Sequence, residues 1–181
     1  EPDSRPVSED LRRMLMELAA LTDKLTVEWT PPSDGPERPC VRVLRADGTD
    51  TGIAFHGVPG GHEFNSFVVG LYNAAGPGQS IDPALAEAIA AIDRPLDLQI
   101  VVALSCTMCP ELVIAAQKIA ASNPLVTAKV YDVNHFPELR ERYKIMSVPC
   151  LIINKAKVAF GKKTLGQLLE LLAEPEAGQT G

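Results

Sequence analysis

The stretch LDLQIVVALSCTMCPE, residues 96–111, decides the fold class of this sequence. Its first residues are mostly apolar and predict a buried strand over 96–104, while the residues that follow predict a helix over 107–121. Between them lie two cysteines in C-x-x-C spacing, Cys106 and Cys109. A strand that leads into a helix through this motif is typical of a redox dithiol or of one half of a zinc site.

Downstream of the cysteines, short strands alternate with helices. The capping box that begins at Thr164 predicts the start of a last helix, which continues to Leu172. The other expected elements are bounded by turn residues: a strand over 126–133, a helix over 138–143, and strands over 148–153 and 158–160. The resulting order, βαβαββα, predicts an α/β fold.

The upstream half repeats part of this pattern. Arg38-Pro39-Cys40-Val41-Arg42-Val43 matches Val148-Pro149-Cys150-Leu151-Ile152-Ile153, and a hairpin and a helix are expected after each. The elements predicted in this half are a helix capped by Ser8, strands over 25–30, 40–46 and 52–56, a helix over 64–75, and a helix from the N-cap Asp82 to residue 92. We therefore predict a tandem duplication with a trimmed first copy in residues 1–92, a second copy in 93–173, and a linker or tail in 174–181.

Composition excludes several classes of protein. The 181 residues are 46% hydrophobic and 22% charged, with a net charge of −6, which argues against a binder of nucleic acid. The longest apolar run, 100–104, is far below the ~20 residues of a membrane-spanning helix. No basic segment followed by an apolar one opens the chain, so we expect no secretory signal and a cytoplasmic location. Because the first residue is Glu1 and not Met, we also expect an excised or processed piece.

The C-x-x-C pair predicts thiol-disulfide exchange. Free N–H groups and the dipole at a helix start stabilise a thiolate, so we expect Cys106 to be the more acidic thiol. Cys109 lies one helical turn further on, within the separation that a disulfide accepts. Val148-Pro149 opens the strand expected beside the pair, and a cis peptide there would place the Val148 backbone against the sulfurs. Pro149 therefore joins the candidate site.

Two alternatives to exchange chemistry stay open. A zinc site needs two more ligands, for which Cys150, His135 and His62 are available, but the sequence has no second close-spaced pair. A structural disulfide would make the chain a non-catalytic interaction module instead of an enzyme. Unless Cys150 is such a zinc ligand, we expect Cys40 and Cys150 to be buried core residues, since free cysteine packs as a small apolar side chain.

Three segments together resemble the N-terminal domain of the flavoprotein (F) component of bacterial alkyl hydroperoxide reductase. They are SCTMCPE at 105–111, Val148-Pro149, and GVPGGHEF at 57–64, whose G-H-E-F is more specific than C-x-x-C. The resemblance runs from about residue 8 to residue 172. It implies two fused thioredoxin-like folds, the first incomplete and without redox cysteines. Met108 departs from the family, which usually has a polar residue there.

The same resemblance implies a function in peroxide reduction. Cys106 would attack the disulfide of a partner peroxiredoxin, Cys109 would resolve the mixed disulfide, and Glu63 would accept a proton near the pair. The electrons would come from a flavin-dependent disulfide reductase domain. Because no G-x-G-x-x-G follows a strand in this sequence, FAD and NADH or NADPH are expected on a partner or another domain. On this chain we expect a redox-active disulfide and neither a metal nor a bound cofactor.

Overall fold

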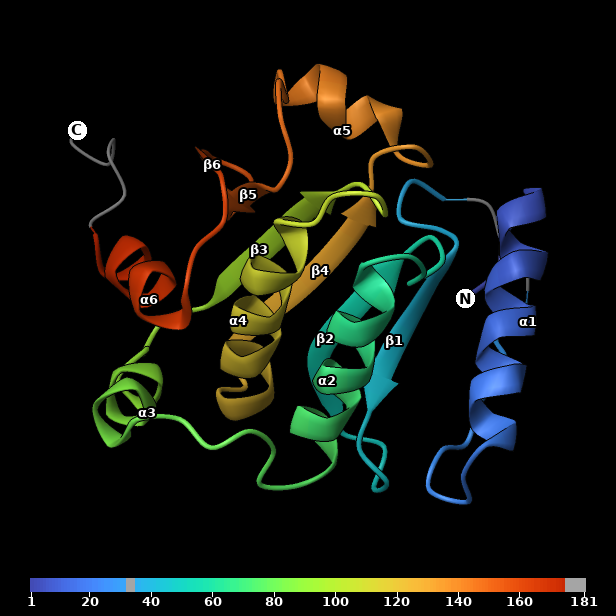
Figure 1. The fold of residues 1–181 in the computed structure, drawn as a ribbon, viewed down its shortest axis with the longest axis horizontal. Coiled ribbons are helices and arrows are strands. Elements are labelled where there is room, and N and C mark those ends of the chain that lie inside the picture. Colours follow the sequence, from blue (N-terminus) through green and yellow to red (C-terminus); the bar gives the residue numbers. More distant parts are fainter. Residues whose placement is uncertain (32–34, 175–181) are drawn as a thin grey trace.

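The structure is a computed structural model that describes residues 1–31 and 35–174. Within these residues six strands form one mixed sheet in the order β1-β2-β4-β3-β5-β6 (Figure 1). The strands are β1 (Cys40–Leu44), β2 (Asp50–His56), β3 (Leu96–Val102), β4 (Val126–Asp132), β5 (Cys150–Ile153) and β6 (Lys157–Phe160). The linker predicted at 174–181 lies, except for Glu174, outside the described residues.

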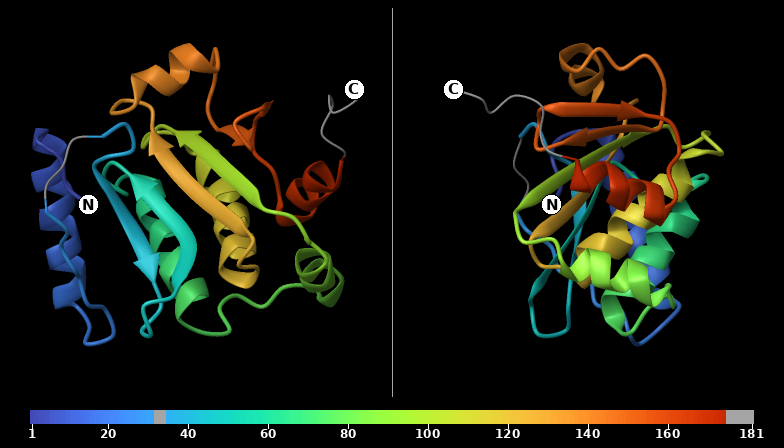
Figure 2. Two further views of the ribbon diagram at one scale, coloured as in Figure 1. Left: turned by 180° about the vertical axis from the view of Figure 1, so that it is seen from behind. Right: turned by 90° about the vertical axis from the view of Figure 1, so that its left-hand side faces the viewer.

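Helices lie mainly over one face of this sheet and at its edges and ends (Figures 1 and 2). They are α1 (Pro6–Ala20), α2 (Glu63–Ala75), α3 (Pro83–Ala90), α4 (Cys109–Ser122), α5 (Pro137–Arg142) and α6 (Leu165–Ala173). The helices α2 and α4 lie side by side across one face, as the views from the front and from behind both show (Figures 1 and 2). In the described residues no helix is both long enough and apolar enough to span a membrane.

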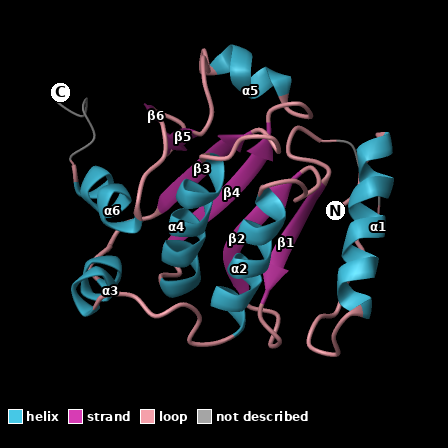
Figure 3. Cartoon of the chain, in the orientation of Figure 1, coloured by secondary structure: helices cyan, strands magenta, loops and turns pink. Residues whose placement is uncertain are grey.

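The second half of the chain forms the part of the sheet that leads to the cysteines. Strands β3 and β4 are parallel and are joined through α4, with Ile100 opposite Val130. Strand β5 then runs antiparallel to β3, and β6 runs antiparallel to β5. Figure 3 shows this alternation of strands and helices. The predicted α/β class and the order βαβαββα are confirmed for this half.

The two halves share the sheet. Strand β2 pairs in parallel with β4, with Phe55 opposite Val130, and β1 pairs antiparallel with β2 at the sheet edge. The hairpin of the first half therefore extends the sheet of the second. Apolar side chains of both halves fill the layer beneath α2 and α4, including Phe55, Phe67, Ile100 and Leu112, each at most 2% exposed. The boundary at residue 92 stays a prediction.

Two predictions in the first half are wrong. Residues 21–31 contain no strand, although 25–30 has the composition of one. A strand needs a neighbouring backbone, and the outer edge of β1 pairs instead with Glu1, whose N and O lie 3.0 and 3.1 Å from the O and N of Cys40. Trp29 lies instead against Arg12, whose guanidinium carbon is 5.3 Å from the ring centroid.

Ser8 is also not the cap of α1. The helix begins at Pro6, and the Ser8 hydroxyl donates to Asp3 Oδ1 at 2.7 Å from inside the first turn. The other two predicted caps are confirmed: the Ala84 N–H donates to Asp82 Oδ1 at 2.8 Å, and the Thr164 capping box forms at the start of α6. Proline at the first helical position explains the error, since it fixes a helix start ahead of Ser8.

Candidate redox site

Cys106 and Cys109 are joined by a disulfide at the end of β3, with Cα atoms 5.6 Å apart. Cys106 lies in a turn, where its N–H donates to Ala103 O at 2.9 Å, and α4 begins at Cys109. The helix therefore starts two residues later than predicted, and Cys109 rather than Cys106 is its first residue. Pro110 fits this later start because the second helical position has no N–H bond to lose.

The two sulfurs differ in access to solvent. Cys109 is fully buried, whereas Cys106 is only partly buried, and the intervening Thr107 and Met108 are exposed. A large molecule that approaches the pair can therefore reach Cys106 but not Cys109.

Pro149 lies beside the pair, as predicted. The Val148-Pro149 peptide is cis, and the Val148 carbonyl oxygen lies 3.9 Å from Cys106 Sγ. This position follows from the sheet, because β5 starts at Cys150 and pairs with Val101 near the end of β3, just before the cysteine turn. An extended segment of another chain could align along the Val148 backbone with its own sulfur near Cys106.

A glycine turn places Glu63 at the same end of the sheet. The His62 N–H donates to Leu104 O at 3.0 Å, which ties the start of α2 to the cysteine turn. Gly61 has φ +54°, and a Cβ at this residue would overlap Leu104 O. Because a side chain at position 61 would clash with backbone, glycine is needed for this close approach.

The packing of α2 on α4 puts Glu63 level with the cysteines. Each of the two helices follows a strand parallel to β4, so they run in the same direction (Figure 1). A Cβ on Gly70 of α2 would lie 2.5 Å from Gln117 Oε1 of α4, so these residues are in contact. Seven residues earlier in each helix are Glu63 and Pro110. Since both helices rise ~1.5 Å per residue, we expect Glu63 at the level of the first turn of α4, which contains Cys109.

Glu63 is a buried carboxyl group. It is 0% exposed, and Ser66 Oγ donates to its Oε2 and lies 3.0 Å from its backbone oxygen. Its Oε1 has no hydrogen-bond partner among the described residues. Burial raises the pKa of Glu63 to about 7, although the bond from Ser66 acts in the opposite direction. Ser66 was not among the predicted site residues, although its position three residues after Glu63 on one helix face could have indicated the contact.

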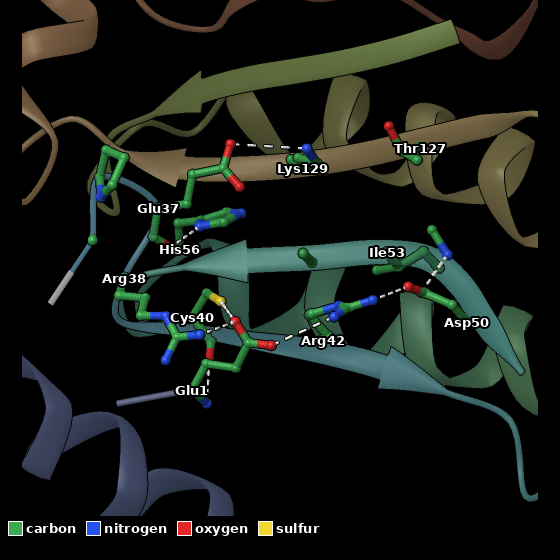
Figure 4. A pocket seen from close by; sticks show the side chains of 14 residues that line it. Glu1, Glu37, Arg38, Cys40, Arg42, Asp50, Ile53, His56, Thr127 and Lys129 are labelled. Carbon is green, nitrogen blue, oxygen red and sulfur yellow. Dashed lines mark hydrogen bonds and ion pairs between the residues drawn. The ribbon is translucent and has the colours of Figure 1, made fainter. Parts of the chain in front are cut away.

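Cys40 and Cys150 are free thiols and buried, as expected. Burial raises the pKa of Cys40 to about 12 and that of Cys150 to about 11. Cys150 packs with Tyr131 and Phe136 on the sheet face away from α4. Cys40 borders a hollow beside β1 and β2, where its thiol donates to Glu1 Oε2 at 3.4 Å (Figure 4).

The histidines proposed as zinc ligands do not gather with the cysteines. His135 lies 3.9 Å from Asp132, and His62 is exposed at the start of α2. Among the described residues, no group of three or more His, Cys, Asp or Glu side chains is arranged to hold a metal ion. His56 faces the hollow of Figure 4, stacks on Tyr131 at 4.0 Å, and has its pKa lowered by burial to about 4.

Comparison with known proteins places this site in a family. A thioredoxin domain model matches residues 96–173, which include both cysteines. The chain is 32% identical over 176 residues to the AhpF component of alkyl hydroperoxide reductase in Pseudomonas aeruginosa, and 32% identical over 178 residues to an NADH dehydrogenase of Ferdinandcohnia aciditolerans. These alignments cover 97% and 96% of this chain, which spans about a third of the length of either relative.

A solved structure covers nearly the same extent. The NTD_N/C domain of alkyl hydroperoxide reductase AhpF from Enterococcus faecalis is 38% identical, with a TM-score of 0.89 over 95% of this chain and 87% of that one. The chain belongs to the AhpF family of alkyl hydroperoxide reductases. It corresponds to the N-terminal domain of that family, so the family prediction and the thioredoxin-like fold class are both confirmed.

Proposed function

We propose that this chain is a thiol-disulfide oxidoreductase domain that relays two electrons from a flavin-linked dithiol to a disulfide of a partner protein. One observation carries the proposal: a disulfide with one accessible and one buried sulfur lies beside the carbonyl group of Val148. Thiol-disulfide exchange needs this asymmetry. The Cys106 sulfur must be accessible to the partner disulfide, while the Cys109 sulfur must be shielded from it and close enough to resolve the mixed disulfide.

The reaction starts from the reduced pair. The Cys106 thiolate attacks one sulfur of the partner disulfide, a Cys106–partner bond forms, and the other partner sulfur leaves as a thiolate. Cys109 then attacks Cys106 Sγ, which forms the Cys106–Cys109 bond and releases the second partner thiolate. Two electrons have passed to the partner, whose thiolates take up protons from solvent. A dithiol of the reductase reduces the pair again by the reverse sequence.

Glu63 handles the proton of the buried thiol in this scheme. Cys109 has no access to solvent, so its proton needs an acceptor within the protein before the sulfur can attack. A carboxyl with a pKa of about 7 is suited to accept that proton near neutral pH and to give it back on re-reduction. Oε1 is the acceptor atom, since it carries no other hydrogen bond among the described residues.

The relatives' names support the direction of electron flow. They describe a component of an alkyl hydroperoxide reductase and an NADH dehydrogenase. We therefore propose a peroxiredoxin as the acceptor and a flavin-dependent disulfide reductase, which takes electrons from NADH or NADPH, as the donor. The flavin and nicotinamide belong to that donor, and no step on this chain requires them.

A trapping experiment tests the proposal. Cys109→Ser should stop the reaction at the mixed disulfide and hold an oxidised two-cysteine peroxiredoxin covalently on Cys106, as a reducible band on gels. Cys150→Ser is the matched control and should release the partner. In parallel, the wild-type domain should accelerate insulin reduction by dithiothreitol. A structural disulfide predicts neither the trapped complex nor the acceleration.

A further inference from the structure

Ser66 stands out among the buried polar residues near the pair. It is 0% exposed in the interior between α2 and the rest of the molecule, and its hydroxyl contacts two oxygens of the same residue, Glu63 Oε2 and Glu63 O. A hydroxyl has one proton to donate and can also accept, so it cannot donate fully to both oxygens at once.

These contacts suit both charge states of the carboxyl group. When Glu63 is ionised, Ser66 Oγ–H donates to Oε2. When Glu63 is protonated on Oε1, Oε2 is the carbonyl oxygen of the acid and still accepts from Ser66 Oγ–H, in a weaker neutral bond. One hydrogen bond between the two side chains is therefore kept in each state, and it is stronger in the ionised state.

We propose that Ser66 is a positioning residue that holds Glu63 Oε2 in both protonation states and so leaves Oε1 as the atom that exchanges a proton with Cys109. The effect on exchange kinetics rests on the proposed function, whereas the effect on the carboxyl titration does not. The assignment explains why a hydroxyl occupies a fully buried position next to Phe67 in α2, where alanine would fill the space with less desolvation.

Among the groups around Glu63, Ser66 has the main specific effect on the pKa of its carboxyl group. The titratable or charged groups on the elements around Glu63 are Cys106 and Cys109, His62 next to Glu63, Glu111 on α4, and Asp132 at the end of β4, and none of them contributes to its pKa shift. Glu111 is exposed and pairs with Lys162 at 3.4 Å, while Asp132 accepts hydrogen bonds from Asn134. Among the described residues, Ser66 is the side chain that hydrogen-bonds to the Glu63 carboxyl.

Removal of the Ser66 hydroxyl should raise the pKa of Glu63. Ser66→Ala takes a charge-assisted bond from the ionised form and a neutral bond from the protonated form, and the former is about twice as strong. The pKa of Glu63 should therefore rise, by about one pH unit, since a net hydrogen bond of this kind is worth about a tenfold change in the ionisation equilibrium.

Carboxyl ¹³C NMR of the full chain labelled with [δ-¹³C]glutamate measures this directly, with the Glu63 signal assigned by its loss in Glu63→Gln. We expect Glu63 to titrate about one pH unit higher in Ser66→Ala than in the wild type. In Ser66→Thr, which keeps the hydroxyl, Glu63 should titrate near the wild-type value. Ser122→Ala, at the exposed end of α4, is the matched control. An unchanged or lowered pKa in a folded Ser66→Ala protein overturns the inference, and this readout does not depend on Ser66→Thr being folded.

Kinetics then show whether the titration governs exchange. The rise of the mixed-disulfide resolution rate with pH should move up by the same interval in Ser66→Ala, a loss of about tenfold below pH 7 that disappears at about pH 9. In a Glu63→Gln background, Ser66→Ala should have no further effect on this rate. A tenfold loss that persists in that background overturns the assignment, because Ser66 would then act independently of Glu63. If the wild type forms no mixed disulfide at all, the proposed function fails while the NMR result stands.

Discussion

The hairpins β1–β2 and β5–β6 have matching sequences but opposite places in the sheet. Each follows an X-Pro-Cys segment with a cis peptide and closes on an apolar-Ala-Phe segment, at Phe55 in the first hairpin and at Phe160 in the second. Strand β2 lies between β1 and β4, whereas β6 is the outermost strand. Phe55 is accordingly 0% exposed and Phe160 43% exposed.

This difference follows from the way in which the two halves share the sheet. Strand β2 of the first half pairs in parallel with β4 of the second half and is therefore an interior strand, whereas β6 lies at the edge. The same pairing brings α2 of the first half, which begins at Glu63, against α4 of the second half, which begins at Cys109. We therefore expect the first half to have two roles, one in stability and one in the proposed redox site, and the predictions below separate them.

The largest expected effect concerns the matched phenylalanines. Phe55→Ala should lower the free energy of unfolding by roughly 3–5 kcal/mol, because it opens a cavity between the sheet and Phe67. Phe160→Ala should lower it by roughly 1 kcal/mol or less, since Phe160 is already 43% exposed to water. Urea unfolding followed by circular dichroism gives both values. Equal losses would mean that β2 is not interior to a shared sheet.

The buried cysteines after the two prolines should behave alike, and both should differ from Cys106. Burial raises the pKa of Cys40 to about 12 and of Cys150 to about 11, against an ordinary value of 9.0, which leaves ~10³-fold and ~10²-fold less thiolate. In the oxidised protein at about pH 8, iodoacetamide should therefore label both residues at least that much more slowly than in urea. Peptide mass spectrometry measures the rates.

Reduction of the disulfide provides the contrast within one sample. Cys106 should then be labelled much faster than Cys40 or Cys150, because it is the more accessible sulfur of the pair. Rapid labelling of Cys150 in the folded, oxidised protein would show that the Val148-Pro149-Cys150 segment is open to solvent. The two X-Pro-Cys segments would then not be equally buried.

Much of the second half was predictable because its pattern is local. The strand at 96–104, the C-x-x-C, and the capping box at Thr164 each carry their signal within a few residues, and the structure differs mainly by one or two residues at element ends. The first half was predicted less well. A strand over 25–30 depends on a neighbour from elsewhere in the chain, and no local pattern records whether that neighbour is present.

The candidate site, too, could be predicted only where the sequence signal is local. Proximity of Cys106 and Cys109 follows from their spacing, and Pro149 follows from the strand order. The burial of Glu63 could not be predicted from the sequence, in which it is a turn residue that follows two glycines. It is enclosed only by the contact of Gly61 with Leu104 and by the packing of α2 on α4. The role of Ser66 depends on that enclosure, so a sequence pattern alone could not assign it.

A smaller effect tests whether the first half contributes a buried acid. The folded-state pKa of Glu63, about 7, is above the ordinary 4.5, so its stability contribution is fully present below pH 4.5 and is lost as pH rises through 7. Glu63→Gln does not titrate and should therefore match the wild type near pH 4 and be more stable by roughly 3 kcal/mol at pH 8, because each pH unit between 4.5 and about 7 is worth ~1.4 kcal/mol. Denaturant unfolding at both values, with exposed Glu87→Gln as control, measures this. A difference independent of pH would contradict the buried titration.

The smallest effect returns to the two hairpins, which both use a cation to cap a helix. Arg45 donates to Ala74 O at 2.7 Å and to Ala121 O at 2.9 Å, near the C-terminal ends of α2 and α4. Lys157 donates to Leu171 O at 3.3 Å near the end of α6, and to the exposed Glu174. A cation at a helix C-terminus satisfies free carbonyls and opposes the negative end of the dipole.

Arg45 should matter more because it binds one helix from each half, whereas Lys157 stays within its own half. We expect Arg45→Ala to lower the free energy of unfolding by about 1 kcal/mol and Lys157→Ala by roughly half of that, and both losses should shrink in about 1 M salt. Arg45→Lys should recover only part of the loss, because a single ammonium cannot match the fork geometry of a guanidinium that spans two carbonyls. Full recovery in Arg45→Lys would show that charge alone acts at this position, and that the hairpin of the first half does not bridge α2 and α4.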